Sequence, residues 1–464
     1  MHTAHTYAQQ HCDRFIEELC AFLRIPSVGT APAYRQSTLQ AAQFLKECFV
    51  KAGADQVRCI QTKGYPLVYA EKRVGEHLPT VLVYGHYDVQ PADPYDLWDA
   101  PPFEPCLRDG KIYARGASDD KGQVYMHVKA LEAMVATRAL PCNLKFLIEG
   151  EEEDGSASLM NFLAQPENQR LLQCDVVLIS DTALISLDQP SVTVGLRGIS
   201  YAEVEVVGPA RDLHSGAYGG IVQNPIHALS HMIDALHDAQ GRITIPGFYN
   251  DVQPISEQEK HETAQEVFDQ EAQRRALDIP AWYGESGYNL TERLGWRPSL
   301  DVNGIWGGYT AEGSKTVLPS RAFAKVSMRL VPNQQAKHVA RAFSKYLCDL
   351  APTGVRVRVR MLHEGENAVV VPSDMVGLRA ACKAFEQVWH KTPSLTRCGG
   401  SIPVVSRFSQ CLQRDIVLMG FALNSDNVHA PNEHFHVASF HKGLETVLCF
   451  YEQLAKQHST SNLV

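Results

Sequence analysis

Along the first 190 residues, the order of apolar and polar positions predicts strands separated by helices. Short apolar runs with the length of buried strands span 80–84, 144–148 and 176–179. Apolar residues at helical spacing mark helices at 8–24, at 38–51 and after Gly122. Strands that alternate with helices are typical of a mainly parallel sheet covered by helices.

The pattern changes near residue 190. Segments that alternate apolar and polar side chains, as half-exposed antiparallel strands do, span 201–207, 323–330 and 355–360. Helices are expected at 225–237, at 335–350 and from Ser256, where Glu259 completes a capping box. The first pattern returns with a helix at 374–390 and an apolar strand at 416–419. We therefore predict an α/β protein with a mainly parallel sheet, formed by 1–190 and 374–464, and an inserted α+β domain at 191–373.

Charged residues that could bind metal follow each of the first apolar runs. His86 and Asp88 follow the first run, and Asp181 follows the third. The acidic run 149–155 follows the second, and an Asp-Asp pair stands at 119–120. In an α/β sheet, functional groups gather at the carboxyl ends of the strands. An imidazole among several carboxylates suits zinc, manganese or cobalt, so this placement favours a two-metal hydrolase.

Each cluster also has an ordinary structural explanation. A histidine after a strand is more often a hydrogen-bonded residue than a ligand, an Asp-Asp pair can form a turn or a helix cap, and an acidic run is usually solvated. Their joint placement favours metal, because like charges brought to one sheet edge repel unless cations neutralise them. One metal centre then explains all the clusters together.

Composition argues against several other classes of protein. The 464 residues exceed the usual size of one domain. A net charge of −9 without a basic stripe argues against nucleic-acid binding. The 12 cysteines are scattered without a Cys-x-x-Cys pair, as expected of reduced thiols in a cytoplasmic protein. No signal-peptide pattern is evident and no apolar stretch approaches the roughly 18 residues of a membrane span, so we expect no membrane association.

An ordered set of motifs gives a specific resemblance. The motifs are VLVYGHYDVQP, WDAPPFEP, DGKIYARGASDDKG, EGEEEDGS, LISD, RDLHSG, SMRLVPNQ, CGGSIPV and HAPNE. The chain resembles the carnosinase-like, cytosolic non-specific metallodipeptidase branch of a dinuclear peptidase family. That family also contains acetylornithine deacetylase, succinyl-diaminopimelate desuccinylase, aminoacylase and carboxypeptidase G. The resemblance implies that 1–190 and 374–464 form the catalytic metallopeptidase domain, and 191–373 a lid and dimerisation domain.

The resemblance also implies a set of metal ligands. His86 and Asp181 would bind one metal ion. Glu153 and His429 would bind a second ion, and Asp119 would bridge both, with a cis peptide bond to the next residue. This set suits two divalent ions per subunit, zinc or manganese, with cobalt also possible.

Two further residues are implied to assist the reaction. Asp88 would hydrogen-bond the imidazole of His86 and raise its basicity. Glu152 would act as the general base, taking a proton from the attacking water and delivering it to the leaving amine. The choice of Glu152 within Glu151–Glu153 rests on counting back from the Gly-Ser pair at 155–156.

Residues of the inserted domain are implied to contact the substrate. His214 would stabilise the oxyanion in the active site of the other subunit, which implies a homodimer. Arg329 would hold the carboxylate of a small peptide, because a guanidinium matches its geometry. Ser401 and the backbone at Gly400 would bind the same carboxylate, and Thr316 is a further polar contact. Taken alone, these residues also fit a surface-loop histidine, a solvent-facing arginine and a Gly-Gly turn.

One segment departs from the family pattern. Where carnosinase-like enzymes place a substrate-contacting histidine, this chain has the sequence NAVVVPS at 367–373, and His363 is the nearby candidate to replace it. This leaves the dipeptide preference open. We expect a metal-dependent dipeptidase; an amidohydrolase that removes acyl groups from N-acyl amino acids and a non-catalytic binding protein on a peptidase scaffold are the alternatives.

Overall fold

In the computed structural model, the chain folds into two compact units. The larger unit comprises Met1–Val194, Val371–Thr396 and Pro403–Val464, and the smaller unit comprises Gly195–Val370 and Arg397–Ile402. The structure describes residues 2–257, 259–260, 270–362, 365–372 and 374–461.

The loop 397–402 belongs with the smaller unit, although the sequence pattern placed it with 374–464. The physical reason is a set of hydrogen bonds to Arg197. Its Nε donates to the carbonyl of Gly399 at 2.8 Å, and its backbone N–H donates to the carbonyl of Gly400 at 3.1 Å.

The larger unit is built on a sheet in which β6, β3, β7 and β18 run parallel. β1 and β2 extend one side of it and β9 the other, each pairing in the antiparallel sense. The strands are β1 (Gln56–Ile60), β2 (Leu67–Lys72), β3 (Thr80–His86), β6 (Asn143–Glu149), β7 (Val176–Ile179), β9 (Ser191–Leu196) and β18 (Asp415–Leu418). Residues 195–196 of β9 already belong to the smaller unit. The predicted α/β fold with a mainly parallel sheet is confirmed.

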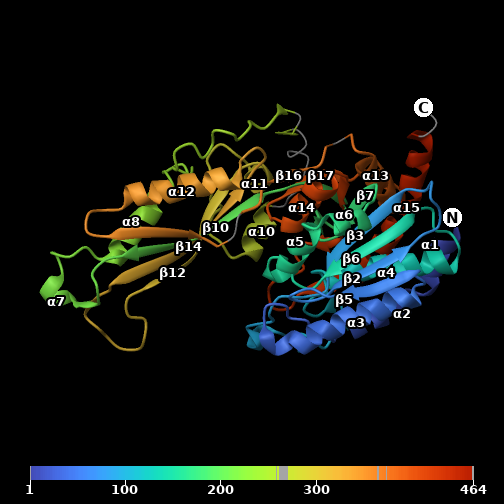
Figure 1. Ribbon diagram of the computed structural model, residues 1–464, viewed down its shortest axis with the longest axis horizontal. Coiled ribbons are helices and arrows are strands. Elements are labelled where there is room, and N and C mark those ends of the chain that lie inside the picture. The colour runs from blue at the N-terminus through green and yellow to red at the C-terminus, as the bar shows by residue number, and fades with distance from the viewer. Residues whose placement is uncertain (1, 258, 261–269, 363–364, 373, 462–464) are drawn as a thin grey trace. The chain divides into compact units, whose positions relative to one another are not determined.

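Helices cover both faces of this sheet, as Figure 1 shows. On one face lie α3 (Arg35–Lys51), α4 (Lys121–Ala136), α13 (Val376–Trp389) and α15 (Val437–Ser461); on the other lie α5 (Ala157–Leu163) and α14 (Pro403–Leu412). Alternate residues of β3 serve the two faces, since Val83 joins the core under α4 while the ring of Tyr84 meets Phe408 of α14. Burial on both faces explains why the central strands are continuous apolar runs.

The remaining elements of the larger unit are short, apart from the N-terminal helices. They are α1 (His2–Gln10), α2 (Cys12–Leu23), η1 (Pro32–Tyr34), η2 (Tyr95–Leu97), β4 (Cys106–Arg108), β5 (Lys111–Tyr113), η3 (Glu152–Asp154), α6 (Pro166–Leu171), β8 (Ala183–Leu184), β19 (Ala422–Leu423) and β20 (His434–His436). The helix expected at 8–24 is in fact two helices that separate at His11. Within the described part of the chain, no helix is both long and apolar enough to span a membrane.

The smaller unit is an antiparallel sheet covered by helices on one face. Its strand order is β12-β14-β10-β15, with bounds β10 (Gly198–Val207), β12 (Ser299–Gly307), β14 (Arg321–Leu330) and β15 (Arg356–Met361). The helices α8 (Pro225–Asp234) and α12 (Ala336–Leu350) pack on β10 and its neighbours. Inward positions of β10 and β14 are buried and alternate with partly exposed ones, which is the pattern that predicted these strands.

Short elements complete the smaller unit: β11 (Leu213–His214), α7 (Ser215–Tyr218), α10 (Gln270–Ala276), α11 (Leu290–Gly295), β13 (Val317–Leu318) and β16 (Val369–Val370), while β17 (Ser394–Cys398) pairs with β9. The predicted capping box is present, because Ser256 N–H donates to Glu259 Oε2 at 2.9 Å and Glu259 N–H donates to Ser256 Oγ at 3.2 Å. The rest of the acidic helix predicted there, at 258 and 261–269, lies outside the described residues, as does His363.

Candidate metal centre

The parallel register brings the predicted ligands to one edge of the larger unit's sheet. β3 lies between β6 and β7, and its last residue, His86, pairs with Glu149 at the end of β6. Tyr84 pairs with Ile179 at the end of β7, so Asp181 follows at the same edge. Side chains that emerge where these strands end therefore face a common space.

His86 is held with one ring nitrogen directed at two carboxylates. Its Nδ1–H donates to the backbone carbonyl of Asp88 at 3.0 Å, which leaves Nε2 as the ring nitrogen that faces the neighbouring carboxylates. Nε2 lies 3.0 Å from Asp119 Oδ1 and 4.0 Å from Asp181 Oδ2. The imidazole is fully buried, so this orientation is imposed by the surrounding protein.

The second oxygen of Asp119 faces a second group of donors. Asp119 Oδ2 lies 2.9 Å from His429 Nε2, which is 3.4 Å from Glu153 Oε2. The donor atoms of His86, Asp119 and Asp181 lie within 4.8 Å of one another, and so do those of Asp119, Glu153 and His429. One carboxylate thus joins two groups of potential ligands, each of its oxygens belonging to one group.

The loop that carries Asp119 is anchored by the buried carboxylate of Glu433. Its Oε1 accepts the backbone N–H of Ser118 at 2.9 Å and of Asp119 at 3.1 Å. Its Oε2 accepts from Arg115 Nη1 at 2.7 Å and from the N–H of Gly116 at 2.9 Å. The peptide bond from Asp119 to the next residue is cis, as the resemblance implied.

The three glutamates that follow β6 point to different places. Glu151 lies against the backbone of Gly64, where an added side-chain carbon would be 1.9 Å from Glu151 Oε1. Glu153 joins His429 and Asp119, and its Oε2 also accepts from Gln90 Nε2 at 2.7 Å. This places Glu153 in the donor group, which is the register expected by counting along the sequence.

The turn before this run is closely packed. An added side-chain carbon on Gly150 would lie 2.3 Å from the Tyr87 ring, whose hydroxyl donates to the carbonyl of Pro66 at 2.6 Å. Only a residue without a side chain fits between the end of β6 and this ring.

Asp88 acts on His86 and on the turn that follows β6. Burial lowers the pKa of the His86 imidazole, but the carboxylates of Asp119 and Asp88 raise it above its usual value. The hydrogen bond that orients His86 goes to the Asp88 backbone carbonyl, and the nearer carboxylate oxygen is 3.5 Å from Nδ1. The carboxylate instead accepts the backbone N–H of Glu152 at 3.3 Å and of Glu153 at 3.1 Å. Asp88 therefore connects the end of β3 to the turn η3.

Burial and mutual repulsion shape the titration of the centre. Burial raises the pKa of Glu152 to about 8, with neighbouring carboxylates including Glu153 adding to the shift. Burial, followed by the charge of Asp119, also raises the pKa of Asp181. Burial opposes ionisation of Asp119 too, but its contacts with His429 and His86 hold its pKa below the usual value. Glu152 and Asp181 thus resist ionisation unless positive charge is supplied.

The donor set fits a pair of divalent metal ions. Two imidazole Nε2 atoms and three carboxylates are the ligands that zinc, manganese and cobalt take in proteins. Glu153 Oε1 is buried without a hydrogen-bond partner among the described residues, so an acceptor is left over in the group that a cation would satisfy. Bound cations would also remove the repulsion between the carboxylates.

Two of the predicted substrate contacts lie together in the smaller unit. His214 of β11 pairs with Val317 of β13, and the Ser215 N–H donates to the carbonyl of Thr316 at 3.0 Å. His214 Nδ1 accepts the backbone N–H of Gly216 at 3.0 Å. A neutral ring held in this way carries its proton on Nε2, which is then free to donate.

The predicted carboxylate-binding residues form a second group in the smaller unit. Arg329 Nη1 donates to Ser401 Oγ at 2.9 Å, and Ser401 Oγ donates to the carbonyl of Arg197 at 2.5 Å. Gly400 lies in the same loop and accepts the backbone N–H of Arg197. Burial lowers the pKa of Arg197 to about 10, with the charge of Arg329 acting in the same direction. The mutual repulsion of these two guanidinium groups would be relieved by a bound anion.

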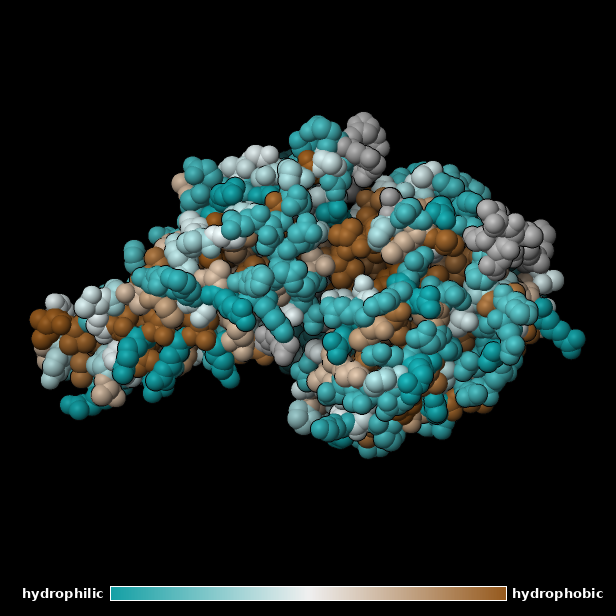
Figure 2. All heavy atoms as spheres, turned by 45° about the horizontal axis from the view of Figure 1, so that its top comes forward, coloured by the Kyte–Doolittle hydropathy of each residue, from teal (hydrophilic) through white to brown (hydrophobic). Residues whose placement is uncertain are grey.

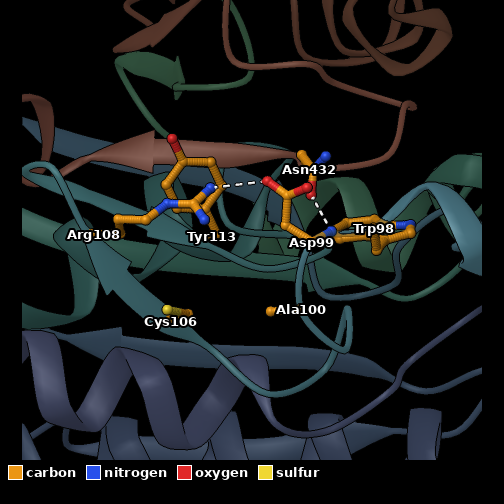
Figure 3. Close-up of a pocket in the computed structure, with 7 residues that line it drawn as sticks. All are labelled: Trp98, Asp99, Ala100, Cys106, Arg108, Tyr113 and Asn432. Carbon is orange, nitrogen blue, oxygen red and sulfur yellow. Dashed lines mark hydrogen bonds and ion pairs between the residues drawn. The ribbon is translucent and has the colours of Figure 1, made fainter.

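Some residues of the site had no role assigned from sequence. Glu433 lies within the motif HAPNE but carries no local signal of its anchoring role, and Gln90 contacts Glu153 from another strand end. A small cavity that Figure 3 shows, bordered by Trp98, Asp99 and Tyr113, has a volume of about 10 Å³. That volume holds one water molecule at most, so it is not a substrate site.

Comparison with known proteins agrees with this geometry. Residues 82–453 match the family described as Peptidase family M20/M25/M40. The chain is 32% identical to the Beta-Ala-His dipeptidase of Homo sapiens, with 97% of this chain and 92% of that protein aligned. It is 31% identical to the Cys-Gly metallodipeptidase DUG1 of Saccharomyces cerevisiae, with 95% of both aligned.

Solved structures of two dipeptidases have the same fold as this chain. The dipeptidase Dug1p of Saccharomyces cerevisiae superposes with a TM-score of 0.87 at 28% identity, and human carnosine dipeptidase 1 with a TM-score of 0.86 at 30% identity. In each case 98% of both chains is covered. The match extends over nearly the whole chain in sequence and in fold, and the chain belongs to peptidase family M20/M25/M40.

Proposed function

We propose that this protein is a metal-dependent dipeptidase with two divalent ions per subunit. The observation that carries the proposal is the Asp119 carboxylate, whose oxygens meet His86 Nε2 at 3.0 Å and His429 Nε2 at 2.9 Å. A carboxylate shared between two donor groups suits a two-metal site. The full-length similarity to proteins named as dipeptidases supports dipeptides as the substrate. Zinc and manganese are the proposed metals, with cobalt as a further fit to the same ligands.

Each residue of the centre has a task in this reaction. His86 and Asp181 would hold one ion, Glu153 and His429 the other, and Asp119 would bridge them. The ions would supply Lewis acidity that lowers the pKa of the attacking water. Glu152 takes the proton of the attacking water and gives it to the leaving amine.

Glu152 is suited to that role. Its pKa of about 8 shows an environment in which the carboxyl readily holds a proton, and its carboxylate forms no hydrogen bond with the other residues that the structure describes. It therefore remains available to the water and to the leaving group.

The smaller unit would recognise the substrate and act as a lid. Arg329, Ser401 and the backbone at Gly400 would bind the carboxylate of the dipeptide, and Thr316 would add a polar contact. His214 would donate from Nε2 to the oxyanion that forms as the peptide bond is attacked. The Gly216 N–H that fixes Nδ1 supports this role, because it sets the tautomer that can donate.

We also propose a homodimer in which His214 serves the active site of the other subunit. Strand β12 lies at the edge of its sheet, and an open edge can pair with a second chain. Figure 2 shows hydrophobic surface on the smaller unit, and its exposed apolar side chains include Ile221, Val302, Ile305 and Trp306. Ile221 is 78% exposed and Ile305 55%, so both side chains are available to pack against a partner.

The proposed location is the cytoplasm. All 12 cysteines are free thiols, five of them buried. Reduced thiols in such number fit a reducing compartment.

Hydrolysis of a dipeptide library tests the function. Protein stripped of metal by a chelator should be inactive and should recover on addition of Mn²⁺, Zn²⁺ or Co²⁺. The Glu152→Gln variant, loaded in the same way, is the matched control for contaminating peptidases. Persistent activity in fully stripped protein would contradict the proposal.

A parallel panel of N-acyl amino acids separates the main alternative. A dipeptidase should cleave a free dipeptide much faster than the N-acyl amino acid that has the same C-terminal residue. Faster release of acyl groups would identify an amidohydrolase, and no turnover of either class by metal-loaded protein would identify a binding protein.

A further inference from the structure

A second cluster of potential metal ligands lies in the larger unit, and it shares no residue with the metal centre. It consists of Asp426, His434 and His436, whose donor atoms lie within 4.8 Å of one another. Asp426 Oδ1 is 3.7 Å from His434 Nε2 and 3.9 Å from His436 Nε2. These separations fall within the range of 2.9 to 4.0 Å between the imidazole nitrogens and carboxylate oxygens of the metal centre.

The strand β20 presents both imidazoles on one face. His434 and His436 are two residues apart, so their side chains project to the same side while Phe435 between them is fully buried on the other. The pairing of β20 with β5 fixes this orientation, with His434 opposite Tyr113 and His436 opposite Lys111.

The carboxylate of Asp426, near the two imidazoles, uses only one of its oxygens in hydrogen bonds with the described residues. Asp426 is fully buried, and its Oδ2 accepts from Ser118 Oγ at 2.9 Å and from the N–H of Leu423 at 2.8 Å. Its Oδ1, which faces the two histidines, has no hydrogen-bond partner among the described residues. A buried acceptor without a partner is costly, so a ligand at this position would be stabilising.

The tautomer of His434 is also that of a metal ligand. Its Nδ1–H donates to the backbone carbonyl of Asn432 at 3.0 Å, which leaves the Nε2 lone pair directed into the cluster. Asn432 is itself held by the N–H of Asp99 and by the carbonyl of Leu97. Figure 3 shows Asn432 beside Asp99 and Trp98, with the hydrogen bond from Asp99 drawn.

A cation already lies beside the cluster. Lys111 Nζ donates to His434 Nε2 at 3.1 Å. Its ammonium stands close to the position that a metal ion would take, and the side chain is only partly buried, so it can turn outward to solvent.

We propose that Asp426, His434 and His436 form a third metal site, specific for a zinc-like divalent transition ion that displaces the ammonium of Lys111. Two imidazoles and one carboxylate are a common three-residue zinc set, with water completing the coordination. A tetrahedral zinc ion with bonds of about 2.0 Å holds its ligand atoms roughly 3.3 Å apart, so small rotations of the imidazoles close the site. Hard ions that prefer oxygen, such as Mg²⁺, do not suit it.

Zinc stoichiometry tests the site without any measurement of activity. Full-length wild type, His436→Ala and Asp426→Asn are dialysed against a series of free Zn²⁺ concentrations, and bound zinc is counted by mass spectrometry. Wild type should hold one more zinc per subunit than either variant. Only the difference matters, so the result does not depend on how many ions the metal centre binds.

His77→Ala is the matched control, because His77 is exposed and belongs neither to the metal centre nor to the cluster of Asp426, His434 and His436. It should bind as much zinc as wild type. Circular dichroism and melting curves establish that each variant is folded, and His436→Ala, at a partly exposed position, is the variant expected to fold normally.

Lys111→Met gives a result in the opposite direction. Removal of the competing ammonium should let the extra zinc bind at a lower free concentration than in wild type. Equal zinc content in wild type and His436→Ala, or an equal loss in His77→Ala, would overturn the proposal. So would an additional equivalent that Mg²⁺ fills as readily as Zn²⁺.

Discussion

At the scale of single residues, adjacent glutamates after β6 have surroundings that suit different tasks. Glu153 lies in a donor group with His429 and Asp119, whereas Glu152 is set among charges without a hydrogen bond to its carboxylate from the described residues. Glu151 is turned toward Gly64. A shift of one position along this run would therefore exchange a ligand for a base.

The first prediction separates these roles. Glu152→Gln should keep both metal ions and lose about 10²- to 10⁴-fold in kcat, because the amide cannot accept the proton. Glu153→Gln should lower the metal content, because it removes an anionic ligand. Metal analysis and steady-state kinetics on the two variants provide the measurement. Loss of metal in the first variant and full occupancy in the second would show that the roles are reversed.

A second prediction concerns Glu149, which is fully buried at the end of β6. Its Oε1 accepts from Tyr84 OH at 2.7 Å and from Ser156 Oγ at 2.9 Å, and burial raises its pKa to about 8 from 4.5. The folded state therefore holds a proton that the unfolded state releases between these two values. The stability that this proton confers is present at low pH and is lost as the pH rises through that interval.

The measurement is the free energy of unfolding of metal-free protein as a function of pH. Relative to Glu149→Gln, which does not titrate, wild type should lose about 1.4 kcal/mol per pH unit between 4.5 and about 8. A constant difference between the two proteins over this range would show that Glu149 is ionised in the folded state.

At the scale of elements, the strands and their ends could be predicted because their signals are local. The apolar runs that became β3, β6 and β7 are continuous in the sequence, and the parallel register then brings His86 and Asp181 to one edge without further information. The pairing of Asp119 with His429, 310 positions apart, came only from the family resemblance.

Other features have no local signal at all. The role of Glu433 depends on backbone groups more than 300 positions away, which no spacing rule reveals. The loop 397–402 joined the smaller unit because of hydrogen bonds to Arg197 about 200 positions earlier, so its position in the chain was misleading. His434 and His436 read as ordinary strand residues until Asp426 is placed beneath them.

A third prediction follows from the way Glu433 joins β20 to the loop of Asp119. Glu433→Ala removes the acceptor of the Arg115 guanidinium and of three backbone N–H groups. Water does not replace this acceptor, because the side chains of Glu433 and Arg115 are each only 1% exposed. Breaking such a buried pair should cost about 3–5 kcal/mol in the free energy of unfolding. Chemical denaturation measures it, with the exposed Glu104→Ala as a control expected within about 0.5 kcal/mol of wild type. A change in Glu433→Ala as small as in that control would contradict this role.

At the scale of the whole molecule, the predicted residues fall into two sets in separate compact units. The metal ligands and Glu152 belong to the larger unit, and His214, Arg329 and Ser401 belong to the smaller one. This division suits a reaction in which one unit performs the chemistry and the other recognises the substrate. If His214 serves the other subunit, each active site needs both chains.

The fourth prediction tests that arrangement. His214→Ala and Glu152→Gln should each be nearly inactive as homodimers. When the two proteins are mixed under conditions that exchange subunits, one site of each heterodimer receives both defects and the other receives neither. Activity should therefore return to at most half of the wild-type value per heterodimer. If heterodimers form, as native mass spectrometry can establish, and activity stays absent, His214 acts within its own subunit or has no catalytic role.

The contact between Gly150 and the ring of Tyr87 has a consequence for how this sequence can diverge. A side-chain carbon added at position 150 would lie 2.3 Å from the ring, so no side chain fits there while the ring stays in place. A substitution at 150 is therefore open to a descendant of this sequence only after position 87 has changed to a smaller residue. The order of the two mutations is therefore constrained. A variant that carries a larger residue at position 150 while Tyr87 is unchanged should be destabilised and removed by selection. Among relatives, a residue larger than glycine at 150 should occur only together with a smaller residue at 87.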